Sequence, residues 1–429
     1  MRILSILATC GLLATVVAAT PARTQAPSTV QVTVDPTVRH QTIDHFGVSW
    51  RTFDDPHLFE RRDPATGRAR TRMSMAEQDE VFDMLFGPAL NLRHLRLVTD
   101  GRIEESRGRF NFERFDVLVD DALRARMRGP VTVAVTVGRY PPERWMGGSV
   151  REYADYFVAL VDRARTRGLL VDYLVFNEPL IDGALIRDVI KAVGRRVPES
   201  VKWIVTDEVK PSRAIPKLPA ILGDAAARRH VAAVSVHLYE EHEPARPLAE
   251  VRRLADRHDL PLWMTEYSGD PWTWARLQMD LLVAHQMSSV SYMWGFFGEW
   301  DRAQLVQGLV DADGAYRGLE PRKVAAVFAQ WSRFVPPGSV RVEATSTDAS
   351  VQVSAFDTPG GRVVVLLNRS AEPRPVELAV PGVRRLTATR TSGREDVAGL
   401  PPVELTGGRV TITLPTPSLT TLIGDVPRP

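Results

Sequence analysis

The sequence predicts an α/β protein in which a (β/α)8 TIM barrel carries an attached antiparallel β-sandwich side domain. Eight short apolar runs recur over residues 43–335, and each interval leaves room for one helix. This pattern is typical of parallel strands joined by helices. Beyond Phe334 apolar and polar residues alternate, with Pro-Gly and Gly-Gly pairs between the segments. Such alternation indicates antiparallel strands with one buried face.

The first residues have the pattern of a secretory signal peptide. Arg2 precedes an apolar run over residues 3–19 that ends in small residues and is shorter than a comfortable membrane span. We expect a signal peptide over residues 1–19, cleavage near Ala19, and export to the periplasm or the medium, with no membrane span. The single cysteine, Cys10, lies within this segment, so the mature chain depends on its core without disulfides.

The remaining elements follow in chain order. We interpret residues 20–29 as a linker and residues 30–42 as an N-terminal strand, which has no place before the first barrel strand and is therefore expected to pair with the β-sandwich. The barrel is expected over residues 43–335 and the sandwich over residues 336–429. The eight predicted barrel strands begin near Ile43, Leu95, Val131, Tyr173, Val201, Val231, Leu262 and Ser289. The predicted sandwich strands cover residues 340–344, 351–356, 363–367, 386–391, 410–414 and 420–423.

Helix signals lie between the predicted barrel strands. Ser74 with Glu77, and Ser149 with Glu152, have the S-x-x-E spacing of a capping box, in which each side chain satisfies a free backbone donor. The first of these helices runs into Gly87-Pro88, a stop signal. The second repeats apolar residues at helical spacing from Tyr153 onward, which predicts one face packed on the barrel.

The composition is that of an ordinary globular protein. The 429 residues are 44% hydrophobic and 25% charged, close to the average of folded domains. The 54 Lys and Arg residues against 52 Asp and Glu leave a formal charge of +2, far below the clustered basic excess that a nucleic-acid backbone requires. We therefore expect no nucleic-acid partner, and we expect a monomer.

Two glutamates end two of the apolar runs. In barrels of this kind catalytic groups project from the carboxyl ends of the strands. The fourth run ends in Asn177-Glu178-Pro179 and the seventh in Thr265-Glu266-Tyr267. One strand-ending glutamate is more often a solvated loop residue or an ion-pair partner, but two of them favour a shared chemical role. The competing acids, which have no comparable local pattern, are Asp100, Asp207, Glu208, Glu240, Glu241, Glu299 and Asp301.

A pair of carboxylates across a cleft is the arrangement that glycoside hydrolysis requires. One carboxyl group must stay protonated to give the leaving oxygen its proton, while the other must stay ionised. The sequence thus predicts a glycosidase with Glu178 and Glu266 as its catalytic pair and a carbohydrate as its substrate.

Four segments resemble those of glycoside hydrolase family 30. Residues 41–49 (QTIDHFGVS) resemble the family's Q-x-I-x-G-F-G-x-S, with His45 where the family usually has glycine. Residues 177–179 and 265–268 are similar to its acid/base and nucleophile strand ends. Residues 331–339 (WSRFVPPGS) resemble its F-S-R-F-I-R-P-G-S exit from the barrel into the sandwich. The resemblance covers almost the whole mature chain.

The resemblance implies a retaining β-glycoside hydrolase with Glu178 as acid/base and Glu266 as nucleophile. Asn177 would hydrogen-bond the sugar 2-hydroxyl. His237 and Tyr239 match the family's H-x-Y, whose tyrosine hydrogen-bonds the nucleophile.

Three further residues match family positions around the sugar. Trp294 matches the aromatic residue of the sugar subsite, although core packing is the ordinary role of such a residue. Arg96 matches a buried arginine that keeps the nucleophile ionised, although it could equally form a structural salt bridge. Trp145 is retained in the loop after the third strand, where the family's P-W-S-P is otherwise replaced.

Other interpretations stay open. The loop after the first strand is rich in arginine and could face an anionic substrate, although we favour a solvated surface loop. A catalytically inactive carbohydrate-binding barrel would share the fold. A metal-dependent barrel hydrolase is suggested by His237 and His242 with two acids between them, but this spacing matches no H-E-x-x-H zinc helix. We expect no metal and no cofactor.

Overall fold

The computed structural model describes residues 29–51, 73–99, 103–137, 149–239, 244–296, 303–311 and 316–425. Eight parallel strands form a ring in the order β10-β9-β8-β7-β6-β3-β2-β11, which the pairing of β10 with β11 closes. The strands are β2 (His45–Trp50), β3 (His94–Val98), β6 (Thr132–Val137), β7 (Tyr173–Phe176), β8 (Lys202–Glu208), β9 (Val231–His237), β10 (Leu262–Glu266) and β11 (Ser289–Phe296). Each begins within two residues of the predicted position, so the predicted barrel is confirmed.

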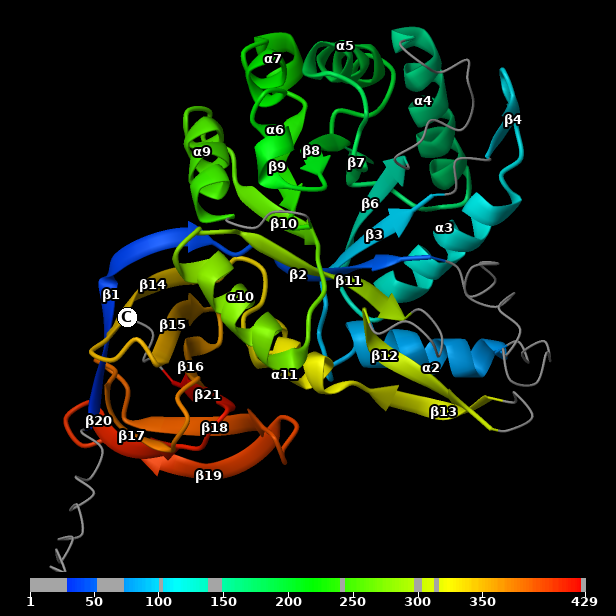
Figure 1. Ribbon diagram of the computed structural model, residues 1–429. Coiled ribbons are helices and arrows are strands. Elements are labelled where there is room, and N and C mark those ends of the chain that lie inside the picture. The colour runs from blue at the N-terminus through cyan, green and yellow to red at the C-terminus, as the bar shows by residue number, and fades with distance from the viewer. Residues whose placement is uncertain are drawn as a thin grey trace, which may run out of the picture.

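Helices surround this ring (Figure 1). They are α2 (Met75–Phe86), α3 (Glu113–Arg126), α4 (Val150–Thr166), α5 (Gly183–Gly194), α6 (Pro211–Ala214), α7 (Leu218–Leu222), α8 (Ala225–Arg228), α9 (Ala245–Asp256), α10 (Pro271–Val283) and α11 (Lys323–Ser332). The capping box at Ser74 forms in full. At α4 Ser149 accepts from the Glu152 backbone, but the Glu152 carboxylate pairs with Arg107 at 2.6 Å instead of capping the helix. Among the described helices, none is long and apolar enough to cross a membrane.

Histidine and tryptophan side chains pack together inside the barrel at the amino-terminal ends of the strands. His45 and His94 stack with centroids 4.2 Å apart, and Trp263 meets His45 edge-on at 4.5 Å. Burial lowers the pKa of His45 well below its ordinary value and that of His94 to about 3, so both rings are neutral at physiological pH. The histidine that replaces the family's usual glycine therefore contributes to core packing, and its Nδ1 lies 2.7 Å from Ser289 Oγ.

Two hairpins are present in addition to the eight predicted barrel strands, and one of them extends the barrel sheet. β12 (Gln304–Val310) pairs in parallel with β11 and antiparallel with β13 (Tyr316–Pro321). β4 (Glu104–Ser106) and β5 (Arg109–Phe110) form a separate two-stranded sheet. The sequence pattern did not predict them because the expected unit contained one strand for each helix.

The second domain is a nine-stranded arrangement in the order β19-β18-β21-β16-β15-β14-β1-β17-β20. Its strands are β1 (Val30–Thr42), β14 (Val340–Ser346), β15 (Val351–Thr358), β16 (Gly361–Asn368), β17 (Arg374–Ala379), β18 (Arg385–Ser392), β19 (Ala398–Glu404), β20 (Arg409–Leu414) and β21 (Ser418–Gly424). β1 lies between β14 and β17 and leads into β2, as the blue strand of Figure 1 shows.

Two of the sandwich strands were not predicted from the sequence, and both contain proline. β17 includes Pro375 and β19 includes Pro401 and Pro402. Proline removes a ladder donor and usually argues against a strand. β19 forms the edge of the sheet, where a missing donor on the solvent side costs no hydrogen bond.

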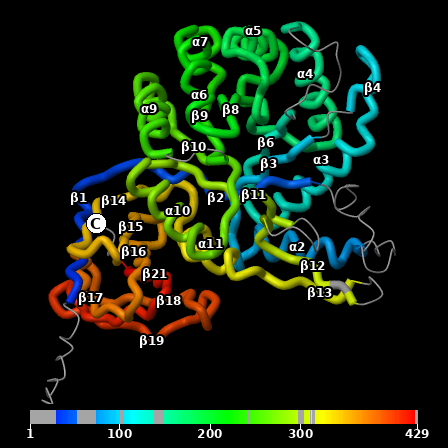
Figure 2. Tube along the Cα trace, viewed as in Figure 1, coloured from blue at the N-terminus to red at the C-terminus, as the bar shows by residue number. Residues whose placement is uncertain are grey.

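The helices α10 and α11 lie between the barrel and the sandwich (Figure 2). Trp331 of α11 donates from Nε1 to Ser354 Oγ at 3.1 Å, and Gln330 donates from Nε2 to Thr391 Oγ1 at 2.8 Å. Lys323 donates to the carbonyl oxygens of Ser392 and Glu395 at 3.0 and 3.1 Å. Side chains of α11 thus join the two domains through hydrogen bonds.

Candidate active site

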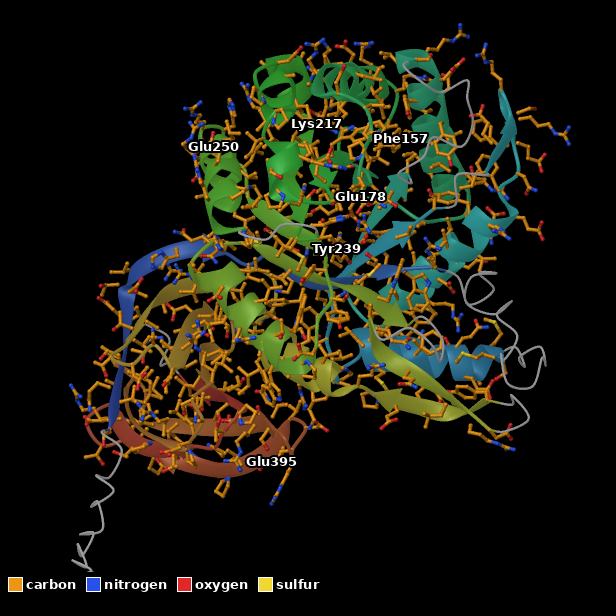
Figure 3. The ribbon with its side chains drawn as sticks, in the orientation of Figure 1. Phe157, Glu178, Lys217, Tyr239, Glu250 and Glu395 are labelled. Atoms are coloured by element: carbon orange, nitrogen blue, oxygen red, sulfur yellow. The ribbon has the colours of Figure 1, made fainter. Side chains whose placement is uncertain are left out.

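Glu178 and Glu266 lie together at the carboxyl end of the barrel. Glu178 is the second residue after the end of β7, and Glu266 is the last residue of β10. One carboxylate oxygen of each glutamate and one ring nitrogen of His237 all lie within 4.8 Å of one another. Figure 3 shows Glu178 and Tyr239 near the middle of the barrel. The structure therefore brings the two sequence-predicted glutamates into one site.

The backbone of Glu178 has an unusual conformation. Its φ angle is 46°, in the left-handed region that residues other than glycine rarely occupy. Its N–H donates to the carbonyl oxygen of Asp207 at 2.8 Å, and the N–H of Asn177 donates to that of Val137 at 3.0 Å. Neighbouring strands thus hold the chain where it leaves β7. Such conformations often occur at active sites, where the surroundings impose them.

Arg96 of β3 connects the polar groups of the site. Its guanidinium is fully buried and donates to Glu266 Oε2 at 2.7 Å and to Asp207 Oδ2 at 2.7 Å. It also donates to Ser49 Oγ at 3.0 Å and to Asn177 Oδ1. Although burial lowers the pKa of Arg96, the charges of Asp207 and Glu266 hold it above its ordinary value. Arg96 therefore stays charged beside Glu266.

Asp207 of β8 is a fully buried residue of the site, and the sequence analysis gave it only as a competing acid. Its Oδ1 atom accepts hydrogen bonds from Ser235 Oγ at 3.0 Å and Thr265 Oγ1 at 2.5 Å. Although burial raises the pKa of Asp207, the charges of Arg96 and His237 hold it well below its ordinary value. Asp207 is therefore a buried carboxylate that compensates the charges around it. Its signal in the sequence, an acid at the end of an apolar run, was the same as that of Glu178 and Glu266.

His237, the last residue of β9, lies between carboxylates. Its Nδ1 atom is 3.4 Å from Glu178 Oε1, and its Nε2 atom is 3.4 Å from Asp207 Oδ2. Burial lowers the pKa of His237, but the charges of Glu266 and Asp207 raise it more strongly, to about 9. The ring is therefore protonated at neutral pH. The sequence assigned His237 to substrate binding, and the structure places it against Glu178.

Tyr239 lies beside the two glutamates, and its ring is 5.2 Å from that of Tyr267. Its hydroxyl donates to Met293 Sδ at 3.1 Å, whereas the family resemblance predicts a hydrogen bond to Glu266. Burial and the charge of Glu266 raise the pKa of Tyr239 above its ordinary value. The hydroxyl therefore keeps its proton, and the contact with Glu266 stays a prediction.

Trp294 of β11 is buried. Its ring lies under Arg51, whose Cζ atom is 5.3 Å from the ring centroid. This distance is typical of a cation–π contact. Trp145 and most of the arginine-rich loop lie outside the described residues. Five of the competing acids and the second histidine of the metal hypothesis also lie outside them, namely Asp100, Glu240, Glu241, His242, Glu299 and Asp301.

The fold and the site define a class of protein. Two glutamates meet at the carboxyl end of a (β/α)8 barrel, and the chain before and after that barrel forms one β-sandwich. This is the architecture of barrel glycoside hydrolases with a fused side domain.

Comparisons with known proteins narrow this class. Residues 338–422 match the family model of the glycosyl hydrolase family 30 beta sandwich domain. The structure is similar to the catalytic domain of GH30 xylanase C from Talaromyces cellulolyticus, with a TM-score of 0.75 and 20% identity over 92% of this chain and 100% of that chain. The family model confirms the resemblance to glycoside hydrolase family 30 for the sandwich, and the barrel shares its fold with a family 30 enzyme.

Two further solved structures share the fold. An endo-β1,6-glucanase is similar with a TM-score of 0.68 and 17% identity, over 94% of this chain and 95% of that chain. A conserved exported protein from Bacteroides fragilis is similar with a TM-score of 0.73 and 14% identity, over 91% of this chain and 99% of that chain. At these identities the likeness is one of fold.

Proposed function

We propose that this protein is an exported, retaining β-glycoside hydrolase in which Glu266 is the nucleophile and Glu178 is the general acid/base. The observation that carries the proposal is the convergence of oxygens from Glu178 and Glu266 within 4.8 Å. Retaining glycosidases hold their two carboxyl groups about 5 to 5.5 Å apart, whereas inverting enzymes need about 6.5 to 9.5 Å to admit a water molecule. The short separation supports the retaining mechanism.

The reaction proceeds in two displacements. In the first, a Glu266 oxygen bonds to the anomeric carbon while the bond to the leaving oxygen breaks, and Glu178 gives that oxygen its proton. In the second, the Glu178 carboxylate takes a proton from water. The water oxygen then bonds to the anomeric carbon, and the Glu266 carboxylate leaves with its electron pair. The configuration at the anomeric carbon is retained because it is inverted twice.

Asn177 is oriented for a contact with the sugar. An arginine can only donate hydrogen bonds, so the oxygen of the Asn177 amide faces Arg96. The amide nitrogen is thereby left as a donor for the substrate. This orientation supports the role in which Asn177 hydrogen-bonds the sugar 2-hydroxyl, an interaction that strengthens in the transition state.

A metal-dependent hydrolase is the second candidate, because Glu178, His237 and Glu266 are close enough to share one ion. Two observations disfavour it. A histidine must lose its proton to bind a metal, whereas the surrounding carboxylates raise the pKa of His237 to about 9. Glu266 is also already paired with Arg96 at 2.7 Å. These contacts also favour an active enzyme over an inactive carbohydrate-binding barrel. Arg96 pairs with Glu266, the proposed nucleophile, and His237 lies against Glu178, the proposed acid/base.

The substrate class is a β-linked polysaccharide, oligosaccharide or glycoconjugate. The similar structures include a xylanase and an endo-β1,6-glucanase, which supports a β-linked sugar chain. Export is supported by the signal-peptide pattern of residues 1–19 and by the likeness to a conserved exported protein. We propose that the protein works as a monomer and needs no cofactor.

The proposal is tested by the first-formed product. Purified protein is incubated with a panel of aryl β-glycosides and β-linked polysaccharides, and the anomer released first is identified by NMR. A β-anomer supports the proposal, whereas an α-anomer or a lack of turnover across the panel contradicts it.

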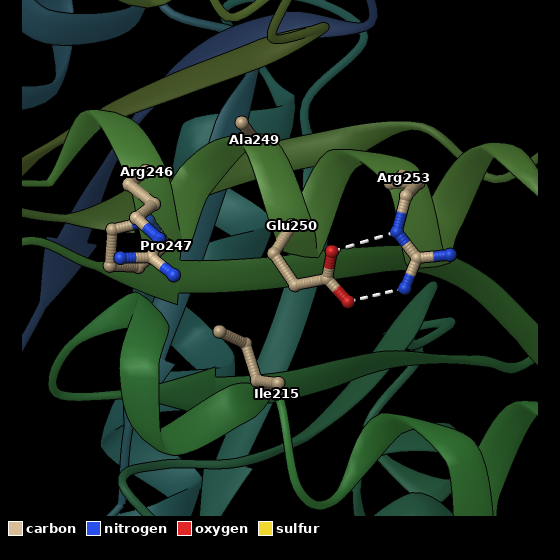
Figure 4. A pocket seen from close by; sticks show the side chains of 6 residues that line it. All are labelled: Ile215, Arg246, Pro247, Ala249, Glu250 and Arg253. Carbon is tan, nitrogen blue, oxygen red and sulfur yellow. Dashed lines mark hydrogen bonds and ion pairs between the residues drawn. The ribbon is translucent and has the colours of Figure 1, made fainter.

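A matched control for the catalytic glutamates lies on the outer wall of the barrel. Figure 4 shows Glu250 of α9 paired with Arg253 in a shallow hollow beside Ile215, with Glu250 Oε2 2.7 Å from Arg253 Nε. Glu250→Gln should retain wild-type turnover, because this residue takes no part in the site.

A further inference from the structure

Lys217 links the segment after Glu178 to the end of β8. It lies between α6 and α7, and its Nζ atom donates to the carbonyl oxygen of Pro179 at 2.6 Å. The same Nζ atom forms an ion pair with Glu208. Pro179 follows Glu178 directly, and Glu208 is the last residue of β8. Figure 3 labels Lys217 and Glu178.

The ion pair is buried. The side chain of Glu208 is 2% exposed and that of Lys217 is 16% exposed. Burial raises the pKa of Glu208, which the charge of Lys217 opposes. A charge that is taken out of water is stable only when it is well paired. Lys217 is therefore held in place by Glu208, with one donor directed at the Pro179 carbonyl.

The backbone around Glu178 is linked to β8 at two points, once directly and once through Lys217. On one side the N–H of Glu178 donates to the carbonyl oxygen of Asp207 at 2.8 Å. On the other side the next carbonyl, that of Pro179, accepts from Lys217, which is anchored to Glu208. The φ angle of Glu178 is 46°, a conformation that a glutamate adopts only where its surroundings impose it.

Backbone packing adds a second contact between these segments. A Cβ atom placed on Gly183 would lie 2.4 Å from the carbonyl oxygen of Lys217. The start of α5 therefore fits against the backbone of Lys217 only because residue 183 is glycine. Lys217 thus meets the segment after Glu178 twice, through its ammonium group and through its backbone.

We propose that Lys217, anchored by Glu208, is a positioning residue that holds Glu178 in place for proton transfer to the leaving oxygen. This inference rests on the proposed function. Glu266 is held separately, by Arg96 and by its own strand. Loss of Lys217 should therefore weaken acid assistance and leave the attack of Glu266 on the anomeric carbon largely unchanged.

Leaving groups separate these two effects. A 2,4-dinitrophenolate leaves without a proton, whereas a phenolate needs one from the general acid. We therefore compare kcat/KM for dinitrophenyl and phenyl β-glycosides in the wild type and in Lys217→Met. The variant should lose at least about tenfold on the phenyl glycoside, a part of the roughly 100- to 10,000-fold that acid catalysis provides. It should lose less than about threefold on the dinitrophenyl glycoside.

Three other variants sharpen the test. Lys217→Arg keeps a donor and a positive charge and should recover part of the loss. Glu208→Gln removes the anchoring charge at nearly constant shape and should lower the phenyl rate selectively, and it carries the test if Lys217→Met does not fold. In a Glu178→Ala background Lys217→Met should cause no further loss on the phenyl glycoside, since residues that act as one unit are not additive.

The control is Lys323→Met, because Lys323 also donates to backbone carbonyls and pairs with a carboxylate, that of Asp396 at 2.5 Å, but does so at the domain interface. Its ratio of phenyl to dinitrophenyl rates should equal that of the wild type. Equal losses on both substrates in Lys217→Met, or no loss, would overturn the inference. If the wild type cleaves neither substrate, it is the proposed function that fails.

Discussion

The guanidinium of Arg96 and the carboxylate of Asp207 form a fully buried ion pair, with Nη2 and Oδ2 2.7 Å apart. The pair continues to Glu266, 2.7 Å from Nη1, and Asp207 also faces the protonated His237. With Glu266 ionised, two buried cations and two buried anions compensate one another. This balance allows the carboxylate of Glu266, the proposed nucleophile, to lie in a buried site, since an unpaired buried ion would strongly destabilise the fold.

Asp207→Asn should destabilise the fold. The amide keeps the shape of the side chain but leaves two cations against one anion. Loss of one partner from a buried ion pair costs about 3 to 5 kcal/mol, and we expect the free energy of unfolding in urea to fall by about this amount.

The control for this change is Asp188→Asn. Asp188 is 37% exposed and pairs with Lys191 at 3.0 Å, and a surface pair contributes about 1 kcal/mol or less. A loss in Asp207→Asn no larger than in the control would show that the buried network does not depend on this charge.

The two glutamates should differ in their response to leaving groups and to azide. Glu266→Ala should abolish turnover of every substrate because it removes the proposed nucleophile. Glu178→Ala should lose activity on natural glycosides but keep much of the first step on dinitrophenyl glycosides. Azide should restore its second step, because it replaces the base-activated water. Product analysis by NMR checks the assignment. A glycosyl azide of retained configuration from Glu266→Ala would contradict it, as would near-normal rates in both variants.

The sequence could predict the barrel and the convergence of Glu178 and Glu266 for physical reasons. Parallel strands that are buried on both faces produce continuous apolar runs, such as the fully buried β10. Glu178 and Glu266 were recognisable because each ends such a run.

The roles of Asp207 and Lys217 could not be predicted in this way. Asp207 matters because closure of the barrel brings β8 to Arg96 of β3. Lys217 matters because one nitrogen reaches the carbonyl of Pro179. Both relationships arise from tertiary contacts, and no spacing along the chain reports them.

Asn177→Ala should slow both steps of the reaction, and azide should not restore it. The amide offers a donor to the sugar and no proton for transfer, so its loss weakens both transition states alike. A hydrogen bond of this kind, next to a charged partner, contributes about 1.5 to 3 kcal/mol, which corresponds to about a 10- to 100-fold fall in kcat/KM. Asn177→Asp should show a similar loss, because it removes the donor while keeping an oxygen toward Arg96. The exposed Asn111, which donates to Glu105 at 3.1 Å, supplies the control Asn111→Ala. A 2-deoxy substrate that loses as much rate in Asn177→Ala as the parent sugar would contradict contact with the 2-hydroxyl.

His237 should make the stability of the fold depend on pH. Burial lowers its pKa, but the charges of Glu266 and Asp207 raise it from 6.5 to about 9. The folded protein therefore holds this proton more tightly than the unfolded chain does. The resulting stabilisation is complete below about pH 6.5 and is lost as the pH rises through 9. A shift of this size corresponds to a free energy on the order of 3 kcal/mol.

Urea unfolding between pH 6 and pH 10 measures this contribution of His237. The free energy of unfolding of the wild type should fall across that window, and the fall should be much smaller in His237→Gln, which cannot take up the proton. His258→Gln, at the end of α9 and away from the site, should keep the wild-type profile. Parallel profiles of the wild type and His237→Gln would mean that the ring is neutral in the folded protein. In that case Arg96 alone would compensate the carboxylates, and the argument against a metal ion bound by Glu178, His237 and Glu266 would lose its main support.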